Sequence, residues 1–158
     1  GPREVFDAEC SRVAFQVNEI LGRGRPRVLV LALETVLTGV RASIEDMERA
    51  SGQSGQQAST LLTIRFGILA RLVADMIGPE ACAGLYLTGG DVMIDSCLTL
   101  GAKGITLVDY VIPQIDQGRI SGGPYDGVPI VCKGGLTGST DTAILSVNRL
   151  FDERKITQ

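Results

Sequence analysis

The sequence of 158 residues contains no histidine and no tryptophan. The lack of histidine excludes Ser-His-Asp and Cys-His catalytic arrangements within this chain, and it removes the commonest zinc ligand. Aromatic residues make up only 4% of the chain, and its net charge is −3 without a basic patch. The positive surface and the stacking residues of nucleic-acid-binding proteins are therefore missing, so we expect no nucleic acid partner.

Long hydrophobic runs and closely spaced cysteine pairs are missing as well. No apolar run approaches the roughly 20 residues that a membrane span needs, so no membrane association is expected. Residues 1–20 carry charges throughout, unlike a signal peptide. No Cys-x-x-Cys pair occurs among Cys10, Cys82, Cys97 and Cys132. We therefore expect reduced cysteines in a cytoplasmic protein rather than a disulfide framework.

The length predicts one domain, and the periodicity of the apolar residues predicts alternating helices and strands. Helices are expected at 6–21, 43–50, 56–77, 92–100 and 140–152. Strands are expected at 27–33, 83–88, 103–112, 119–121 and 128–132, with a turn at 113–118. The apolar run 27–33 predicts a strand buried on both faces, and Pro129 predicts that the last strand starts near a sheet edge. The fold class is α/β, a layered domain with a mostly parallel or mixed central sheet flanked by helices.

The first candidate site is the stretch Thr88-Gly89-Gly90-Asp91, which joins a predicted strand to a predicted helix. Glycines let the backbone approach a ligand closely, and helix N-termini attract phosphate groups. Asp91 is a candidate ligand for Mg²⁺ or for a ribose hydroxyl. The alternative is a purely structural turn in which Asp91 caps the helix.

The second candidate site is Lys133-Gly134-Gly135-Leu136-Thr137-Gly138, near the other end of the chain. It is not a P-loop, because the lysine precedes the glycines. Lys133 offers a point charge to a phosphate, and the alternative is a glycine-rich connection with a solvated lysine. If the two preceding strands are parallel neighbours, both turns face one crevice at the carboxyl end of the sheet, where such sheets bind ligands.

Two further loops allow a structural and a functional interpretation. The polar, glycine-rich segment 51–57 is either a flexible loop or a lid that contacts phosphate. The loop 122–127 contains Tyr125, which either stacks on a base or belongs to an ordinary hairpin loop.

Taken together, these motifs resemble the C-terminal, nucleotide-binding domain of the four-carbon acid sugar kinases. The resemblance rests on Gly89-Gly90-Asp91-Val92, on Gly122-Gly123-Pro124, and on Lys133 to Gly138 followed by Asp141. It covers the chain well from about residue 85 to the end, and residues 6–84 in layout only.

The resemblance implies an ATP-binding domain, with Mg²⁺, from a kinase that phosphorylates acids such as threonate and erythronate. The implied nucleotide-binding residues are Gly89, Gly90, Asp91, Val92, Lys133, Gly134, Gly135 and Gly138, with Asp91 as the metal ligand. The family's sugar-acid site and catalytic groups lie in an N-terminal domain. The resemblance therefore implies that residues 1–158 are one nucleotide-binding domain of a longer two-domain kinase, with no catalytic residue of its own and no activity alone.

A function of another class is also compatible with the sequence. In that alternative, the chain is a non-catalytic α/β module that binds a small molecule or an effector. It is favoured by Val92 and Leu136, which are apolar at two motif positions. The expected partners are otherwise ATP or ADP and the missing sugar-acid-binding domain, and the sequence also allows a homodimer.

Overall fold

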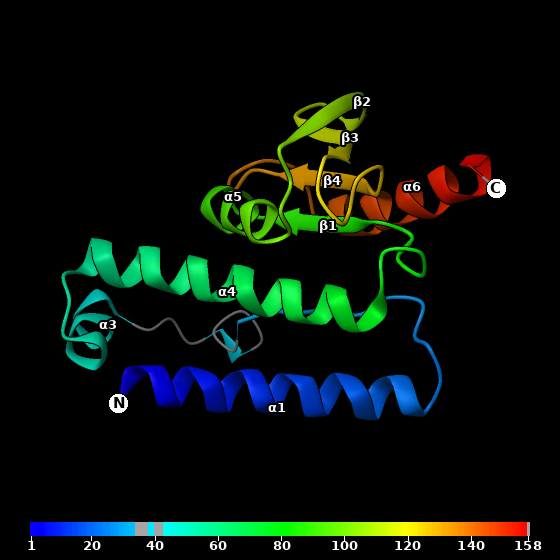
Figure 1. Cartoon of the computed structure of the whole chain (residues 1–158). Coiled ribbons are helices and arrows are strands. Elements are labelled where there is room, and N and C mark those ends of the chain that lie inside the picture. Colours follow the sequence, from blue (N-terminus) through cyan, green and yellow to red (C-terminus); the bar gives the residue numbers. More distant parts are fainter. Residues whose placement is uncertain (34–37, 40–42, 158) are drawn as a thin grey trace.

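The computed structural model describes residues 1–33, 38–39 and 43–157. The helices are α1 (Pro2–Gly22), α3 (Ile44–Ser51), α4 (Gly55–Ile77), α5 (Gly90–Thr99) and α6 (Thr142–Thr157). The strands are β1 (Leu85–Thr88), β2 (Gly104–Ile112), β3 (Ile115–Ser121) and β4 (Pro129–Lys133). Figure 1 shows α4 beneath the sheet layer and α1 below α4, with α5 and α6 beside the strands.

The sheet has the order β1-β4-β3-β2. Its β1–β4 pair is parallel, while β3 is antiparallel to both β4 and β2. The predicted α/β class with a mixed sheet flanked by helices is therefore confirmed. The position of β4 corrects one expectation, because this strand lies inside the sheet and not near its edge. Pro129 is tolerated there as the first residue of the strand.

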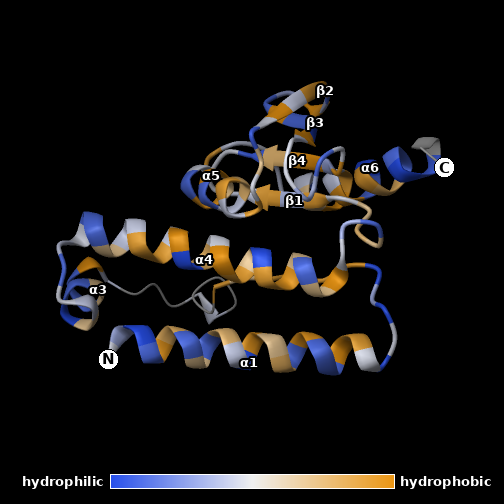
Figure 2. Cartoon of the chain, in the orientation of Figure 1, coloured by the Kyte–Doolittle hydropathy of each residue, from blue (hydrophilic) through white to orange (hydrophobic). Residues whose placement is uncertain are grey.

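Two apolar clusters cover the two faces of the sheet. Alternate residues of a strand point to opposite faces, so Ile130 faces one cluster and Val131 the other. The Ile130 cluster includes Leu100 at the end of α5, and the Val131 cluster includes Leu150 of α6. Figure 2 shows the apolar character of β1 and β4 between these helices. The sheet is thus packed on both faces around β4, whereas residues 104–110 of the edge strand β2 are exposed.

A third apolar cluster joins α1 to α4. It contains Val13 and Val17 of α1 and Leu69 and Val73 of α4, all buried. The predicted helices 6–21 and 56–77 are therefore confirmed, each a little longer than expected. The short helix at 43–50 is confirmed as α3, which Ser43 caps by accepting a hydrogen bond from the Asp46 N–H at 3.0 Å.

The prediction of a strand at 27–33 is wrong. These residues form no strand in the structure. Leu29 and Leu31 pack into the cluster between α1 and α4, while Val30 is 76% exposed. The run is therefore buried on one side only, and its inward residues contact helices. Since a strand needs a neighbouring backbone to complete its hydrogen bonds, the apolar run alone did not determine its structure.

The turn predicted at 113–118 is also too long. Only Pro113 and Gln114 separate β2 from β3, and Gln114 adopts a left-handed φ of 70°. Gly118 belongs to β3, where a Cβ would lie 2.6 Å from the Thr106 carbonyl oxygen. The glycine that indicated a turn instead permits a close approach of two strands.

The ends of two later helices differ from the expected bounds. The helix expected at 92–100 begins at Gly90, so Asp91 lies in its first turn. The helix expected at 140–152 begins at Thr142. The Thr142 hydroxyl oxygen accepts a hydrogen bond from the Ser139 N–H at 2.7 Å. All four cysteines are free in the structure. No helix among the described residues is long and apolar enough to cross a membrane.

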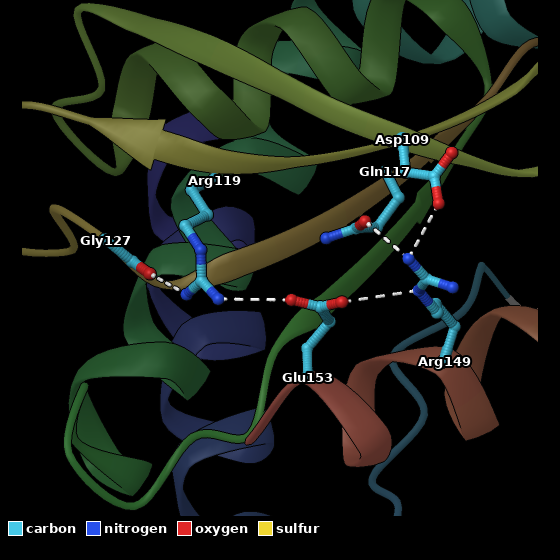
Figure 3. A network of polar contacts seen from close by, with 6 residues as sticks. All are labelled: Asp109, Gln117, Arg119, Gly127, Arg149 and Glu153. Atoms are coloured by element: carbon cyan, nitrogen blue, oxygen red, sulfur yellow. Dashed lines mark hydrogen bonds and ion pairs between the residues drawn. The ribbon is translucent and has the colours of Figure 1, made fainter. Parts of the chain in front are cut away.

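Charged side chains link α6 to the sheet (Figure 3). Glu153 of α6 pairs with Arg119 of β3 at 3.1 Å and with Arg149 at 3.4 Å. Arg149 also contacts Asp109 of β2 at 2.9 Å. The Glu153 side chain is only 11% exposed and lies between the two guanidinium groups. The network therefore fixes α6 to two strands, β2 and β3, that precede it by about 30 to 40 positions.

The loop at 122–127 is a tight connection, as expected for a hairpin loop. Tyr125 is 1% exposed, and its hydroxyl donates a hydrogen bond to Asp75 of α4 at 2.6 Å. Stacking of Tyr125 on a base is therefore contradicted, because the ring is buried in the core. Burial favours the neutral phenol and helps to raise the pKa of Tyr125 well above its usual value.

Replacing Tyr125 with phenylalanine is expected to lower the free energy of unfolding by about 1–2 kcal/mol at pH 7. Desolvation raises the pKa of Asp75, but hydrogen bonds from Tyr125 and Arg71 outweigh it, so the pKa lies below the ordinary 3.8. A lowered carboxyl pKa stabilises the fold above pH 3.8, and this contribution is lost as the pH falls through the folded-state value. The variant should therefore lose less stability than the wild type on acidification.

Urea denaturation at pH 7 and at pH 3 measures both effects. Tyr110→Phe serves as the control, because Tyr110 is 54% exposed on β2. An equal loss of stability for both variants at pH 7 would contradict the role of the Tyr125–Asp75 hydrogen bond.

Candidate functional site

The two glycine turns lie side by side at the carboxyl ends of the strands β1 and β4. Strands β1 and β4 are parallel neighbours, with Thr88 opposite Lys133 at their carboxyl ends. The Gly89 N–H continues the pairing by donating to the Lys133 carbonyl oxygen at 3.0 Å. The condition for a shared crevice, that the two strands be parallel and adjacent, is therefore met.

The first turn presents the beginning of α5. Gly89 adopts a φ of 95°, which favours glycine. The first helical hydrogen bond runs from the Met93 N–H to the Gly89 carbonyl oxygen at 2.9 Å. The N–H groups of Gly90, Asp91 and Val92 precede this bond, so they have no acceptor within the helix. A Cβ built on Gly90 would meet no atom within 4 Å, which indicates open space beside these donors.

The second turn follows β4 and is held by internal hydrogen bonds. The Thr137 hydroxyl donates to the Gly134 carbonyl oxygen at 3.1 Å, and the half-buried Lys133 ammonium donates to the same oxygen at 3.0 Å. Gly135 borders open space, like Gly90. Gly138 has a φ of 86°, and a Cβ there would lie 2.5 Å from the Thr142 hydroxyl oxygen. Gly138 therefore allows the turn to approach α6 closely.

These observations separate the predicted site residues into two groups. Gly90, Asp91 and Val92 offer N–H groups at a helix N-terminus, where negative charge is stabilised. Gly89 and Gly138 are required for the backbone conformation, and the Gly89 N–H is already used by Lys133. The valine side chain at position 92 does not affect the donor at that position, because the donor is its backbone N–H.

Asp91 is the one acidic residue in the first turn of α5. The described residues contain no group of three or more histidine, cysteine or acidic side chains that could hold a metal ion. A Mg²⁺ ion at Asp91 would therefore take most of its ligands from phosphate oxygens and water, which is how Mg²⁺ commonly binds beside nucleotides. The residues present fit such a shared ion and do not fit a cage made by protein side chains alone.

A cavity beside Asp91 was not predicted from the sequence. Its volume is about 580 Å³, and it is lined by α3, the first two turns of α4 and the start of α5. On α4, Gln56, Ser59, Thr60 and Thr63 line it at offsets 0, 3, 4 and 7. This spacing forms one polar face of a helix, and it is the signal that could have indicated the cavity. Gly55 and Gln56 of the polar segment 51–57 also reach it.

The Gly122-Gly123-Pro124 motif is not part of this site. A Cβ on Gly123 would lie 2.4 Å from the Gly101 carbonyl oxygen, so the loop packs against the C-terminal end of α5. The loop also precedes β4, whereas both glycine turns follow their strands. The loop therefore lies at the amino end of β4, away from the two glycine turns. Its glycines allow close packing against α5.

The domain has an open α/β sheet with two glycine turns at the carboxyl ends of neighbouring parallel strands. Open α/β proteins bind their ligands beyond these strand ends. The sequence model of the family described as "Nucleotide-binding C-terminal domain" matches residues 2–143. The chain belongs to this family, the C-terminal nucleotide-binding domain of the four-carbon acid sugar kinases. The resemblance inferred from the glycine motifs is therefore confirmed.

Three curated relatives carry names of the same kind. A D-erythronate kinase of Heliobacterium modesticaldum is 35% identical over 98 residues, which are 62% of this chain and 22% of the relative. A D-threonate kinase of Bordetella bronchiseptica is 34% identical over 86 residues, 54% of this chain and 21% of the relative. A D-threonate kinase of Salmonella typhimurium is 31% identical over 102 residues, 65% of this chain and 23% of the relative. The chain thus spans about a fifth of the length of these relatives.

Two crystal structures of one Bordetella bronchiseptica protein, described as a domain of unknown function, are similar in fold. Both hold citrate and form a domain-swapped dimer. One matches with a TM-score of 0.51 and 32% identity, covering 56% of this chain and 22% of the other. The second crystal form matches with a TM-score of 0.54 and 23% identity, covering 88% and 38%.

Proposed function

We propose that this chain is the ATP-binding domain of a cytoplasmic kinase that phosphorylates four-carbon sugar acids of the threonate and erythronate type. The observation that carries the proposal is the adjacency of the two glycine turns, since Thr88 and Lys133 are partners at the ends of parallel strands. The family and the names of the relatives supply the class of reaction.

The chain's part in the reaction is to hold the phosphate groups. The donors are the N–H groups of Gly90, Asp91 and Val92 in the first turn and of Gly134 and Gly135 in the second, where Gly135 borders open space. Lys133 supplies a positive charge once its ammonium leaves the Gly134 carbonyl oxygen, which lies 3.0 Å away. Phosphate carries negative charge whereas the carbonyl oxygen is neutral, so Coulomb attraction makes phosphate a better partner for Lys133 than the carbonyl.

Asp91 is the proposed ligand of Mg²⁺, with phosphate and water completing the coordination. ATP supplies the phosphoryl group, and Mg²⁺ neutralises part of its charge. The residues described here hold one substrate, while the sugar acid is proposed to bind in an N-terminal domain outside this chain. Because phosphoryl transfer depends on positioning both substrates, the isolated domain is expected to bind nucleotide without catalysing transfer.

We further propose that the chain forms a homodimer. The dimers of the Bordetella bronchiseptica protein support this assembly. Light scattering of the purified chain measures the molar mass directly.

The proposal is tested by calorimetric titration of the chain with ATP and Mg²⁺. Lys133→Ala is expected to weaken binding by about 10-fold or more, because a hydrogen bond to a charged group contributes about 1.5–3 kcal/mol. Asp91→Asn should weaken binding only when Mg²⁺ is present. Lys155→Ala is the matched control, since the Lys155 side chain is 78% exposed in a surface pair on α6.

Two results would contradict the proposal. One is the absence of any heat or thermal shift at millimolar ATP with the wild-type chain. The other is nucleotide binding that Lys133→Ala and Asp91→Asn leave unchanged, which would make both turns structural and favour a module that binds another small molecule.

A further inference from the structure

The outer edge of β2 is open to another strand. β2 is the last strand in the order β1-β4-β3-β2, so its outer backbone groups pair with no strand in the described part of the chain. All residues from 104 to 110 are exposed. Figure 1 places β2 at the side of the molecule opposite α1, and Figure 2 shows its apolar colouring. A long exposed edge strand with apolar side chains is a template for pairing with another chain.

Apolar side chains of β2 gather on the face of the sheet that α5 covers. Ile105 pairs with Ile120 of β3, which belongs to the core cluster at the end of α5. Leu107 lies two positions further along the strand and points to the same face. Ile105 is 40% exposed and Leu107 is 53% exposed. An apolar groove of about 250 Å³ lies between α5 and the start of β2, and Ile105 and Leu98 are among the residues that line it. α5 therefore leaves the β2 end of this face exposed.

The first half of β2 can form an antiparallel pair with its own copy. Residues 104–107 pair with β3 without interruption, and the first register shift follows Leu107. The segment 104–108 carries no charge. When two such segments pair about a two-fold axis at Thr106, Ile105 of each copy lies opposite Leu107 of the other. Apolar side chains that lie opposite each other stabilise a strand pair.

The charges at the two ends of this segment select that register. Lys103 precedes the segment and Asp109 follows it. With the axis at Thr106, each lysine lies opposite the aspartate of the other copy, so no like charges face each other across the pair. Moving the axis by one residue would place Lys103 opposite Leu107, or Asp109 opposite Ile105. The Asp109 side chain points toward α6, so its attraction to the lysine acts across the strand edge and not as a direct ion pair.

We propose that a second copy of this chain docks on the outer edge of β2. The two β2 strands pair antiparallel about a two-fold axis at Thr106, and they join two four-stranded sheets into one. Ile105 and Leu107 of both copies pack together on the α5 face. The same register brings Tyr110 of each copy, which is 54% exposed, close to Ala102 of the other copy at the apolar groove. Each copy keeps all of its own elements.

The interface rests on the proposed homodimer and is independent of nucleotide binding. The glycine turns follow β1 and β4, and β3 separates both of these strands from β2. Substitutions at Ile105 or Tyr110 change the interface as well as the fold. Their effect on unfolding is therefore measured at protein concentrations at which the chain is monomeric.

Leu107→Lys tests the interface, because it places a charge opposite Ile105 of the second copy. The dissociation constant of the dimer should rise by about 10-fold or more, since burying a charge without a partner is costly. Analytical ultracentrifugation over a series of protein concentrations measures this constant. Val5→Lys is the control, because Val5 is 70% exposed on α1 and should leave the constant unchanged. Circular dichroism verifies the folding of both variants, and both should bind ATP like the wild type.

Thr106→Cys tests the register of the strand pair. Residues directly opposite each other in an antiparallel pair have Cα atoms about 4.5–5.5 Å apart, a separation that a disulfide spans. Oxidised glutathione should take two electrons and two protons from the two introduced thiols, which yields one disulfide between the copies and two molecules of reduced glutathione. Electrophoresis without reductant measures the covalent dimer. The controls are Ser11→Cys, at an exposed position of α1, and the wild-type chain with its four native cysteines.

Three results would overturn parts of this inference. A wild-type chain that stays monomeric at the highest concentration measured overturns both the homodimer and the interface, while the titrations with ATP test the phosphate site separately. A dimer that Leu107→Lys leaves intact overturns the interface but not the homodimer, and it indicates an exchange of elements between copies instead. Dissociation by Leu107→Lys without a disulfide at position 106 overturns the register.

Discussion

Replacing Ile130 with alanine is expected to lower the free energy of unfolding by about 3–5 kcal/mol. Ile130 is 0% exposed on β4, the strand between β1 and β3. Its side chain packs in the cluster that includes Leu100 and Ile120. These neighbours come from α5 and β3, so the sheet and the helix cannot both move to fill the space. The cost therefore includes a residual cavity as well as lost burial.

Chemical denaturation of the purified variant measures this loss. Ile105→Ala provides the control, since Ile105 is 40% exposed on β2 at the edge of the sheet. Its expected cost is below about 1.5 kcal/mol, because the side chain is already partly in water. If the two variants lost equal stability, the central position assigned to β4 would be wrong.

Replacing Glu153 with alanine is expected to be similarly severe, at about 3 kcal/mol. Glu153 lies 3.1 Å from Arg119 and 3.4 Å from Arg149, whose side chains are 29% and 34% exposed. Without the carboxylate, the partly buried Arg119 loses its ion-pair partner, and Arg149 keeps Asp109 of β2 (Figure 3). A buried charge without its partner is strongly destabilising. The loss in the free energy of unfolding therefore exceeds the net contribution of the original ion pairs.

The neighbouring residue on α6 supplies a close control. Asp152 pairs with Lys155 at 3.4 Å, but its side chain is 65% exposed. Asp152→Ala should therefore change the free energy of unfolding by no more than about 0.5 kcal/mol. Thermal or chemical unfolding of both variants in the same buffer measures the difference. An equal effect at the two positions would show that the network does not anchor α6.

The sequence was sufficient for the helices because their signals are local. The spacing of Val13 and Val17 placed them on one buried face of α1, as the structure confirms. Gly78 and Pro79 correctly marked the end of α4. The general rule for α/β sheets placed the two glycine turns at one crevice if their strands were parallel neighbours, and the pairing of Thr88 with Lys133 meets that condition.

The errors arose where the outcome depends on distant residues. Whether the run 27–33 becomes a strand depends on a neighbouring backbone, and in the structure Leu29 and Leu31 contact helices instead. Gly118 indicated a turn by its residue type, yet it lies inside β3 because Thr106 approaches it closely. Tyr125 looked available for stacking, but its partner Asp75 is 50 positions away and holds it in the core.

Only part of the candidate site was predictable from the sequence. Residue types indicated the glycine turns and Lys133, whereas the cavity is formed by α3, α4 and α5 together. The spacing of α4 and α5 is close at Gly67, where a Cβ would lie 2.8 Å from the Asp95 carbonyl oxygen. No local pattern encodes that spacing, although the polar face of α4 marks one wall.

The position of α4 between two apolar clusters affects how cooperatively the domain unfolds. Leu69 and Val73 of α4 belong to the cluster with α1, whereas Ala74 belongs to the cluster with Ile130. Separation of α1 would disrupt only the first cluster, and the sheet with its turns would remain packed. Local opening of this kind needs less free energy than global unfolding. The helical signal in circular dichroism then reports on both events, whereas the near-ultraviolet tyrosine signal reports on the second, because all three tyrosines lie outside α1.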